Sequence, residues 1–595
     1  MKVTITDGFW ADRLRTNRTR TIPHGFEQLH RSGVLGNLRM AAGAEGTYQA
    51  YSDSAGTGLR FLDSDAYKWL EAVGWELGRG ADPGLAGAAD EVIGIVAAAQ
   101  RDDGYINSYV QVLDGGTPHR NLAWGHEFYC VGHLIQAGIA WHRALGDDRL
   151  LSIATRAADR IDEEFGPGRR DGVDGHPGIE MALVELTRVT GERRYLDLAS
   201  RLLELRGRGL LGAERFGAAY WQDHEPVRRA ETVAGHAVRQ LYLDCGAVDV
   251  AVELGDDALL TAVRRRWDDL MRTRTYLTGG MGSRHRDEAF GDPFELPPDR
   301  AYAETCAAIA SVMLAWRLLL ATGEVSYADA MERAMFNGVL SGLSLTGTAF
   351  HYVNPLQRRT SRTYEPPGHG ERAPWYPCAC CPPNLMRLLS SWERHQATGD
   401  GSGVRIHHYA TSQIAAGDLA LSVRTDYPWD GRVTIHIGRT HDSPWTLALR
   451  VPAWCRAATV TGPDGTRVAG PGAVALTRSW RAGDTVVLDL DLPVRLTEPD
   501  PRIDAVRGCV AVERGPIVYC VESDDLPPAT ELEELSWDSG RQPLVAPRPD
   551  VGAGIVGVRV PMAAPGRDGH LTAGAIPYYA WGNRRVGGMR VWIPR

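Results

Sequence analysis

Between about residue 60 and residue 400, apolar positions recur at the spacing of an α-helix, and a short polar turn interrupts them repeatedly. Each clear interruption is a glycine followed by an acidic residue, at Gly146-Asp147, Gly191-Glu192, Gly255-Asp256 and Gly323-Glu324. Glycine ends a helix in a left-handed turn, and an acidic residue favours the start of the next helix. The pattern predicts helical hairpins, with a weaker copy near Gly78 to Leu85.

The helices of these hairpins differ in how far apolar residues surround them. Residues 306–321 are apolar on nearly all sides, whereas residues 150–161 are amphipathic. A helix inside a ring is apolar all round, and a helix outside it needs one apolar face. A repeat of roughly 45 to 70 residues, continued to about six hairpins, predicts an (α/α)6 barrel. Long loops at one end of the ring would carry function.

After about residue 405 the pattern changes to short runs in which apolar and polar residues alternate, such as LALSVRT, RVTIHIG and TVVLDLDLP. This alternation is typical of strands that bury one face, and successive runs of this kind predict β-sandwiches. We predict an (α/α)6 barrel at residues 1–405, a β-sandwich at 406–500 and a second at 501–595. The opening KVTIT is a further strand candidate for one of these sheets.

Bulk composition agrees with several globular domains. The 595 residues exceed the roughly 250 to 300 at which single cores stop growing. A net charge of -9 without a basic patch offers no footprint for nucleic acid or an anionic membrane. The opening MKVTITDGFW lacks the apolar run of a signal peptide, and no stretch approaches the length of a membrane span. We expect a cytoplasmic protein.

Three of the nine cysteines lie within YPCACCPPNL, residues 376–385. In a reducing compartment, clustered cysteines are more often metal ligands or catalytic groups than disulfides. Pro382 and Pro383 suit the first turn of a helix, which places the sulfurs of Cys380 and Cys381 where the helix dipole favours thiolates. The alternative is a run of small buried side chains.

The best additional metal ligands are Glu304 and Cys306, at the start of the apolar segment 306–321. Residues two apart face the same side of an extended segment, so both could point at one ion. With Cys380 and Cys381 they would make a set of three sulfurs and one oxygen, which suits zinc. The alternative is that Glu304 caps its helix and Cys306 lies in the core.

Histidines and one carboxylate complete the candidates. His126, Cys130 and His133 share one helix face and could form a rival metal site, bind sugar hydroxyls or lie in the core. His176 and His236 each follow a glycine at the head of a helical segment, as His126 does. Glu288 follows the glycine-rich loop TGGMGS and is either a general acid or a solvated surface group.

Four motifs in this order resemble glycoside hydrolase family 127 and its close relatives, the β-L-arabinofuranosidases. They are the loop SRHRDEAFG, the triplet Glu304-Thr305-Cys306, HYVNPL at residues 351–356, and CACCPPN. The resemblance extends from FLDSDAYKWLEA near the start to YYAWGNRRVGGMRVWIP at the end. It implies an (α/α)6 catalytic barrel followed by β-sandwich domains, which agrees with the periodicity.

The resemblance also implies roles for residues of this chain. Zinc ligands fall on Glu304, Cys306, Cys380 and Cys381, the nucleophile on Cys380 and the acid/base on Glu288. Substrate contacts fall on His126, His176, His236 and Tyr352, with Trp124 as a stacking surface, while Cys378 has no assigned role. The implied reaction is a retaining double displacement in which a zinc-bound thiolate replaces the usual carboxylate.

Three functions remain open from the sequence. The first is an exo-glycosidase that releases L-arabinofuranose from a β-linked oligosaccharide or glycoconjugate, or performs the same chemistry on another sugar. The second is a non-catalytic carbohydrate-binding protein with a structural zinc, which would not need both Glu288 and Cys380. The third is a sugar isomerase or lyase, because (α/α)6 barrels host those activities too. A homodimer through the β domains is a further expectation.

Overall fold

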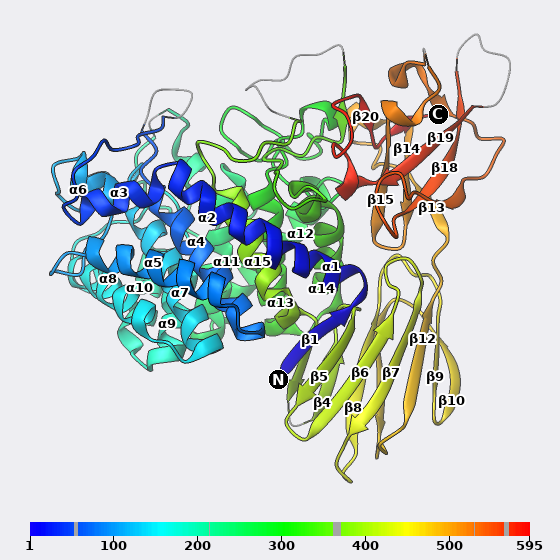
Figure 1. The fold of residues 1–595 in the computed structure, drawn as a ribbon, viewed down its shortest axis with the longest axis horizontal. Helices are drawn as coiled ribbons and strands as arrows, with labels where there is room; N and C mark the ends of the chain where they lie inside the picture. The colour runs from blue at the N-terminus through cyan, green and yellow to red at the C-terminus, as the bar shows by residue number, and fades with distance from the viewer. Residues whose placement is uncertain (53–57, 214, 361–369, 401, 529, 565–570) are drawn as a thin grey trace.

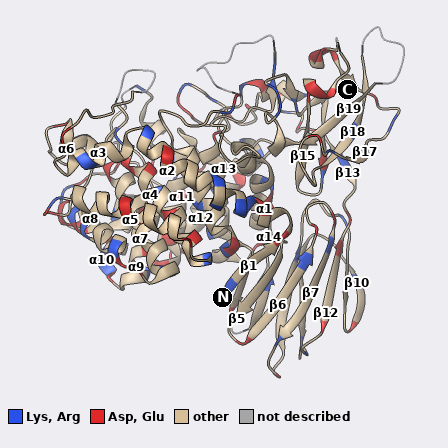
Figure 2. Cartoon of the chain, viewed as in Figure 1, with Lys and Arg blue, Asp and Glu red and all other residues tan. Residues whose placement is uncertain are grey.

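The computed structural model describes residues 1–52, 58–213, 215–360, 370–400, 402–528, 530–564 and 571–595. Figure 1 shows three regions: a helical region coloured blue to green, a β region coloured yellow, and a second β region coloured orange to red. Charged residues of both signs are interspersed over the outer helices (Figure 2).

Within the described residues, six helices form the inner ring of the helical region. They are α4 (Asp63–Arg79), α7 (Glu127–Leu145), α9 (Ile179–Thr190), α11 (Ala237–Leu254), α13 (Thr305–Thr322) and α15 (Cys381–Ser391). Each contacts the next in this order, and α15 returns to contact α4, which closes the ring. The predicted barrel of helical hairpins is confirmed.

Each inner helix before α15 leads into an outer helix that covers it. The outer helices are α5 (Pro83–Ala99), α8 (Arg149–Phe165), α10 (Arg193–Leu205), α12 (Asp257–Thr273) and α14 (Val325–Arg333). Gly146, Gly191, Gly255 and Gly323 end α7, α9, α11 and α13 with φ between 65° and 78°, as the turn pattern predicts. Gly80 ends α4 in an extended conformation instead, which explains why this fifth copy of the turn is weaker in the sequence. The opening helices α1 (Gly8–Thr16), α2 (Ile22–Arg31) and α3 (Val34–Ala41) complete the outer layer.

Helix α13 is the one helix among the described residues that is long and apolar enough to cross a membrane. In the fold 67 % of this helix is buried, and it packs against α11, α14 and α15. Its apolar character on all sides is therefore that of an inner barrel helix.

The first β region is built from two sheets. In the described chain, seven strands form one sheet in the order β1 (Lys2–Asp7), β5 (Thr411–Ala416), β6 (Leu419–Thr425), β7 (Arg432–Arg439), β12 (Thr485–Leu490), β9 (Ala458–Gly462) and β10 (Gly465–Ala469). The other sheet has the order β11 (Gly472–Arg478), β8 (Trp445–Val451), β4 (Gly403–Ile406) and β3 (Ala397–Asp400). The N-terminal strand thus pairs with β5, more than 400 residues away (Figure 1). Buried and accessible residues alternate along β7, as its sequence predicts.

The last β region begins with β13 (Val494–Thr497), the first strand of its sheet. Its main strands are β14 (Cys509–Arg514), β15 (Ile517–Glu522), β18 (Val556–Ala563) and β19 (Leu571–Pro577), with β16 (Ser536–Trp537) and β17 (Leu544–Pro547) pairing β18. The short strand β20 (Met589–Arg590) pairs both β15 and β2 (Gln357–Arg358), and β2 comes from a loop of the helical region. This last β region therefore contacts the catalytic barrel directly.

Candidate active site and metal centre

The predicted site residues gather where the inner helices begin. Four of them are the residues that immediately precede an inner helix: His126 before α7, His236 before α11, Glu304 before α13 and Cys380 before α15. The first turn of a helix presents unpaired N–H groups and a positive dipole end. One end of the barrel therefore offers a positive potential to a group of anionic ligands.

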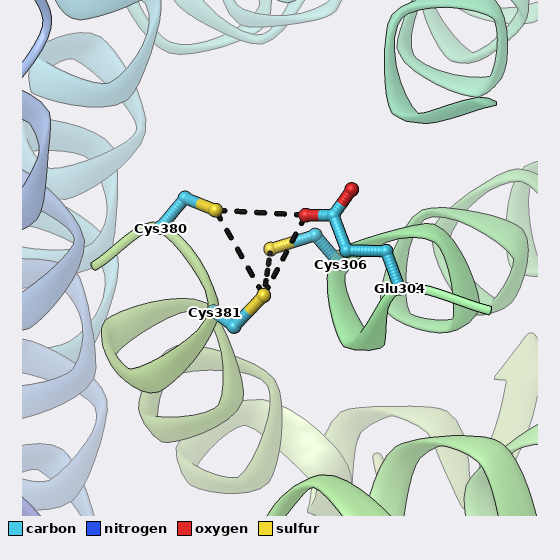
Figure 3. A group of neighbouring side chains, drawn as sticks. All are labelled: Glu304, Cys306, Cys380 and Cys381. Atoms are coloured by element: carbon cyan, nitrogen blue, oxygen red, sulfur yellow. Dashed lines mark hydrogen bonds between the residues drawn. The ribbon is translucent and has the colours of Figure 1, made fainter. Parts of the chain in front are cut away.

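Glu304, Cys306, Cys380 and Cys381 form one compact group (Figure 3). The Sγ atom of Cys381 lies 3.3 Å from that of Cys306 and 3.8 Å from that of Cys380. Glu304 Oε1 lies 3.5 Å from the Sγ atoms of both Cys380 and Cys381. Cys380 is the partly exposed sulfur, and the other three residues are buried.

The local backbone differs from the sequence expectation in one respect. Cys306 lies in the first turn of α13, not in an extended segment, and only Glu304 precedes the helix. The two side chains still converge because Glu304 is held by a β-bridge to Val353. Ala303 adopts a φ of 38°, which is strained for a residue with a Cβ and redirects the chain into the site.

The electrostatics of this group fit a bound cation. Burial, together with the neighbouring Cys380, raises the pKa of Glu304 well above its ordinary value. Burial also raises the pKa of the Cys381 thiol. Glu304 Oε2 is buried with no hydrogen-bond partner among the described residues. A cation between the four side chains would bind Glu304 through Oε1, the oxygen that lies against the sulfurs, and would stabilise the anionic forms that burial alone disfavours.

Glu288 lies beside this group and is held by a histidine. His236 Nδ1 accepts a hydrogen bond from Val238 N, so the ring proton sits on Nε2 and is donated to Glu288 Oε2 at 2.9 Å. Partial burial raises the pKa of Glu288, but hydrogen bonds from His236 and Tyr302 outweigh it and the net direction is downward. Ligand atoms of His236, Glu288 and Glu304 lie within 4.8 Å of one another.

The three Gly-His residues line one wall of the site. The ring centroid of His176 lies 5.7 Å from that of His126 and 6.0 Å from that of His236. His176 Nδ1 donates to Pro177 O, which leaves Nε2 as an acceptor. Burial lowers the pKa of each histidine, so all three are neutral at pH 7.

Arg239 is a site residue that the sequence reasoning missed. Its guanidinium lies over the rings of Tyr220 and Trp221 and donates to His126 Nε2 at 3.3 Å. Because His126 Nδ1 donates to Trp124 O, both nitrogens of this ring are engaged. The available signal was the position of Arg239 three residues after His236, on the same face of α11.

Lys68 is a second missed residue, a lysine on the inner helix α4 with no exposed surface. Its Nζ lies 3.2 Å from Ser64 Oγ and 3.8 Å from Asp65 Oδ1. Burial lowers its pKa, but Asp65, Cys380 and Cys306 outweigh this effect and the net direction is upward. From the sequence alone, a lysine among the charged residues of α4 is expected at the surface. Only the closed ring of helices buries it.

Tyr352 contacts the exposed sulfur of the group. Its hydroxyl lies 3.1 Å from Cys380 Sγ and 3.7 Å from Cys378 Sγ. Cys378 therefore borders the site without joining the four ligands. Every cysteine lies in the described part of the chain, and all nine are free of disulfides.

The rival metal site on α7 does not form. Cys130 and His133 are buried on that helix, but no candidate metal group of the described residues includes them or His126. His133 instead packs edge-on against Tyr129. Trp124, the expected stacking surface, is partly exposed and packs edge-on against Trp221.

Sequence models of one family cover almost the whole chain. The β-L-arabinofuranosidase GH127 catalytic domain matches residues 2–394, the GH127 middle domain 403–492, and the glycoside hydrolase family 127 C-terminal domain 494–594.

Characterised and solved relatives agree. The chain is 34 % identical over its full length to the full-length non-reducing end β-L-arabinofuranosidase of Bifidobacterium longum subsp. longum. It superposes on the crystal structure of a GH127 β-L-arabinofuranosidase of Geobacillus stearothermophilus T6 with a TM-score of 0.93, 36 % identity and full coverage of both chains. A second solved GH127 β-arabinofuranosidase gives a TM-score of 0.92 at 33 % identity, covering 100 % of this chain and 96 % of the other. The protein therefore belongs to glycoside hydrolase family 127.

Proposed function

We propose that the protein is a retaining exo-glycosidase that releases L-arabinofuranose from β-L-arabinofuranosides, with zinc at the Cys/Glu group and Cys380 as nucleophile. The observation that carries the proposal is the arrangement of the partly exposed Cys380 thiol, its three buried neighbours and the carboxylate of Glu288 at one end of the barrel. The β-L-arabinofuranosidase activity of the relatives supports the choice of sugar. The substrate is an oligosaccharide or glycoconjugate.

The donor set and its spacing favour zinc. Three sulfurs and one carboxylate oxygen are typical zinc ligands, with Zn–S distances of about 2.3 Å and Zn–O distances of about 2.0 Å. A regular tetrahedron with those distances has S···S edges of about 3.8 Å and S···O edges of about 3.5 Å. Two of the S···S separations are 3.3 and 3.8 Å, and two of the S···O separations are 3.5 Å. Bound zinc would keep the coordinated thiols deprotonated at neutral pH.

In the first half of the proposed reaction, Cys380 Sγ bonds to the anomeric carbon while the bond from that carbon to the leaving oxygen breaks. Glu288 gives its proton to the leaving oxygen. His236 donates to Oε2 of Glu288 and so fixes the position of the carboxyl group. Exclusion of water by the bound sugar favours the protonated form of Glu288 that this half requires.

In the second half, Glu288 takes a proton from water, and the water oxygen bonds to the anomeric carbon as the C–S bond breaks. The hydrogen bonds from His236 and Tyr302 favour the carboxylate form that this half requires. Two displacements on opposite faces retain the anomeric configuration. His176 Nε2 is available to accept a hydrogen bond from a sugar hydroxyl.

A panel of p-nitrophenyl furanosides and pyranosides tests the proposal with the wild type, Cys380→Ser and Glu288→Gln. We expect turnover of the β-L-arabinofuranoside by the wild type and a loss of at least about a thousandfold for Cys380→Ser. Cys509→Ser is the matched control, because Cys509 is also partly exposed but lies in the last β region. Equal activity of wild type and Cys380→Ser would remove the nucleophile assignment. Turnover of a different glycoside would replace L-arabinofuranose as the assigned sugar. Binding without turnover of any glycoside would favour a carbohydrate-binding protein.

A further inference from the structure

The segment that carries Tyr352 lies between the metal-ligand loop and the last β region. On the barrel side, Thr305 N donates to Tyr352 O at 3.0 Å, and Thr305 Oγ1 donates to His351 O at 2.8 Å. These bonds tie the segment to the residue that stands between Glu304 and Cys306. Since Tyr352 Oη lies 3.1 Å from Cys380 Sγ, the path of this segment decides where the hydroxyl meets the sulfur.

The other side of the same segment is held by the last β region. Gln357 and Arg358 form strand β2, which pairs with β20. Tyr578 Oη donates to the carbonyl oxygens of Asn354 and Pro355 at 3.0 and 2.9 Å. Tyr352 therefore lies on a segment, residues 351–358, that is bonded to the barrel on one side and to the last β region on the other. We call this segment the strap.

The loop after β19 makes a further contact between this domain and the strap. The Trp581 indole stacks on His351, the neighbour of Tyr352, with centroids 4.4 Å apart and planes at 27°. Gly582 follows with a φ of +67°, and a Cβ there would lie 3.2 Å from His351 Cε1 and 3.3 Å from Nε2. Glycine is needed both for the backbone conformation and for the close approach to the ring.

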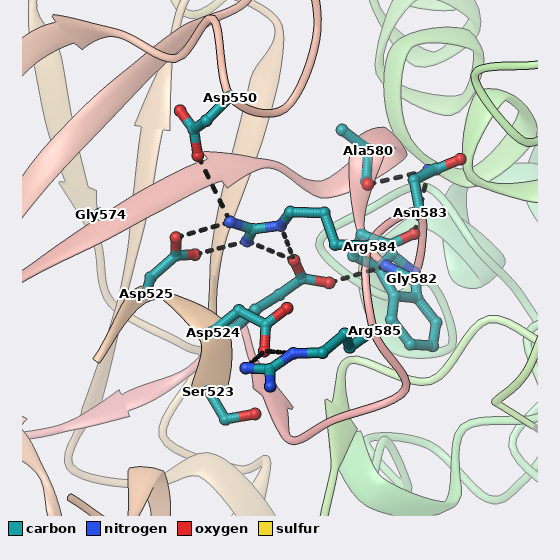
Figure 4. Close-up of polar contacts among 12 residues, drawn as sticks. Ser523, Asp524, Asp525, Asp550, Gly574, Ala580, Gly582, Asn583, Arg584 and Arg585 are labelled. Carbon is teal, nitrogen blue, oxygen red and sulfur yellow. Dashed lines mark hydrogen bonds and ion pairs between the residues drawn. The ribbon is translucent and has the colours of Figure 1, made fainter. Parts of the chain in front are cut away.

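A network of ion pairs holds this loop in place (Figure 4). Glu522 accepts a hydrogen bond from Gly582 N at 2.7 Å and pairs with Arg584 at 2.5 Å. Arg584 also pairs with Asp525 at 2.8 Å. Glu522 and Asp525 are almost fully buried at the end of β15, so the loop is fixed to the body of the sheet and not only to the barrel.

We propose that Trp581 and Gly582 are positioning residues that set the place of Tyr352 against Cys380, which makes the last β region a working part of the catalytic site. The Glu522–Arg584 pair fixes the loop, the loop fixes the His351 ring, and the position of His351 fixes that of the adjacent Tyr352. The kinetic consequence rests on the proposed function, while the mechanical coupling does not.

Gly582→Ala tests the proposal, with Gly508→Ala as the matched control. Both glycines lie in the last β region with positive φ, at +67° and +75°, but a Cβ at Gly508 meets nothing within 4 Å. The two variants share the backbone strain, and only Gly582→Ala pushes on His351. Because a Cβ at Gly582 would force His351 to move by a few tenths of an ångström, we expect Gly582→Ala to lower kcat by about tenfold, with KM within about twofold. Gly508→Ala should retain wild-type kcat.

Hydrogen exchange of the full-length protein gives a readout that does not depend on activity or on metal. The amides of His351, Asn354 and Leu356 donate to backbone carbonyls at 2.9, 3.2 and 2.9 Å. Peptides that contain them should exchange faster in Gly582→Ala and at the wild-type rate in Gly508→Ala. Equal kcat and exchange for Gly582→Ala and wild type, or equal losses in the two variants, would overturn the proposal. An inactive wild type with the expected exchange difference would instead reject the proposed function and leave the coupling standing.

Trp581 provides a second pair of variants if Gly582→Ala does not fold. Trp581→Phe keeps an aromatic ring over His351. Trp581→Leu removes the stack. We expect Phe to retain kcat within threefold and Leu to lose at least tenfold with KM unchanged. Equal kcat for the two variants would contradict a positioning role.

Discussion

Replacement of a single buried cysteine can distinguish two interpretations of the Cys/Glu group: a metal centre, or a cluster of core cysteines. Cys306→Ser removes one of the four proposed ligands, and Cys245→Ser is the matched control. Both cysteines are buried on inner helices, at 3 % and 0 % exposure, but no candidate metal group of the described residues includes Cys245. Burial raises the pKa of Cys245 to about 12, so it is a neutral thiol.

The expected loss follows from the number of ligands. Zinc bound by four protein ligands contributes about 10 to 16 kcal/mol, or about 2.5 to 4 kcal/mol for each ligand. Each 1.4 kcal/mol is a factor of about ten in the dissociation constant. We therefore expect Cys306→Ser to weaken zinc binding by roughly a hundredfold to a thousandfold and Cys245→Ser to leave it unchanged.

The assay is an equilibrium competition for zinc against a chromophoric chelator, with the bound metal counted by elemental analysis. The same samples should show zinc-dependent thermal stabilisation in the wild type and in Cys245→Ser, because a ligand that binds only the folded state raises its stability. A wild type that takes up no zinc, or a Cys306→Ser variant whose affinity is within twofold of the wild type, would refute the assignment of this group as a zinc site.

Three further predictions concern a buried ion pair away from the site and two residues of the site. Arg450→Met leaves buried Glu332 without its ion pair and should lower the free energy of unfolding by about 3 to 5 kcal/mol. The control Arg432→Met removes an exposed ion pair and should lower it by less than about 1 kcal/mol. Equal denaturation midpoints for the two variants would contradict this prediction. His236→Ala removes a hydrogen-bond donor to the Glu288 carboxylate and raises the pKa of Glu288, so the alkaline limb of the pH profile of kcat/KM should move to higher pH. An alkaline limb at the wild-type pH or at a lower pH would exclude Glu288 as the acid. Arg239→Lys loses the hydrogen bond to His126 and should lower kcat/KM about tenfold. A steady-state kcat/KM within twofold of the wild-type value would disprove this prediction.

Parts of the site could be predicted because their signals are local. Pro382 and Pro383 marked the start of α15, and the structure begins that helix at Cys381. The pairing of Glu304 with Cys306 was predicted from their spacing of two residues in an extended segment, although Cys306 proved to be helical. Lys68 could not be found in this way, because only the closed ring buries it and brings it near Cys306 and Cys380. Arg239 had one local signal, its position three residues after His236, but its contact with His126 on another helix comes from the fold.

The sequence by itself determined the helical hairpins, the change to alternating strands and the identity of the chemical groups. Each of these depends on residues a few positions apart, such as Gly146 at the end of α7 or the cysteines of residues 378–381. Only the tertiary structure decided that residues 304 and 380 share one site, that β1 joins a sheet with β5, and that Trp581 reaches His351. The physical reason is that closing a ring of helices and docking a sheet on it depend on the packing of distant surfaces, which no local spacing of residues records.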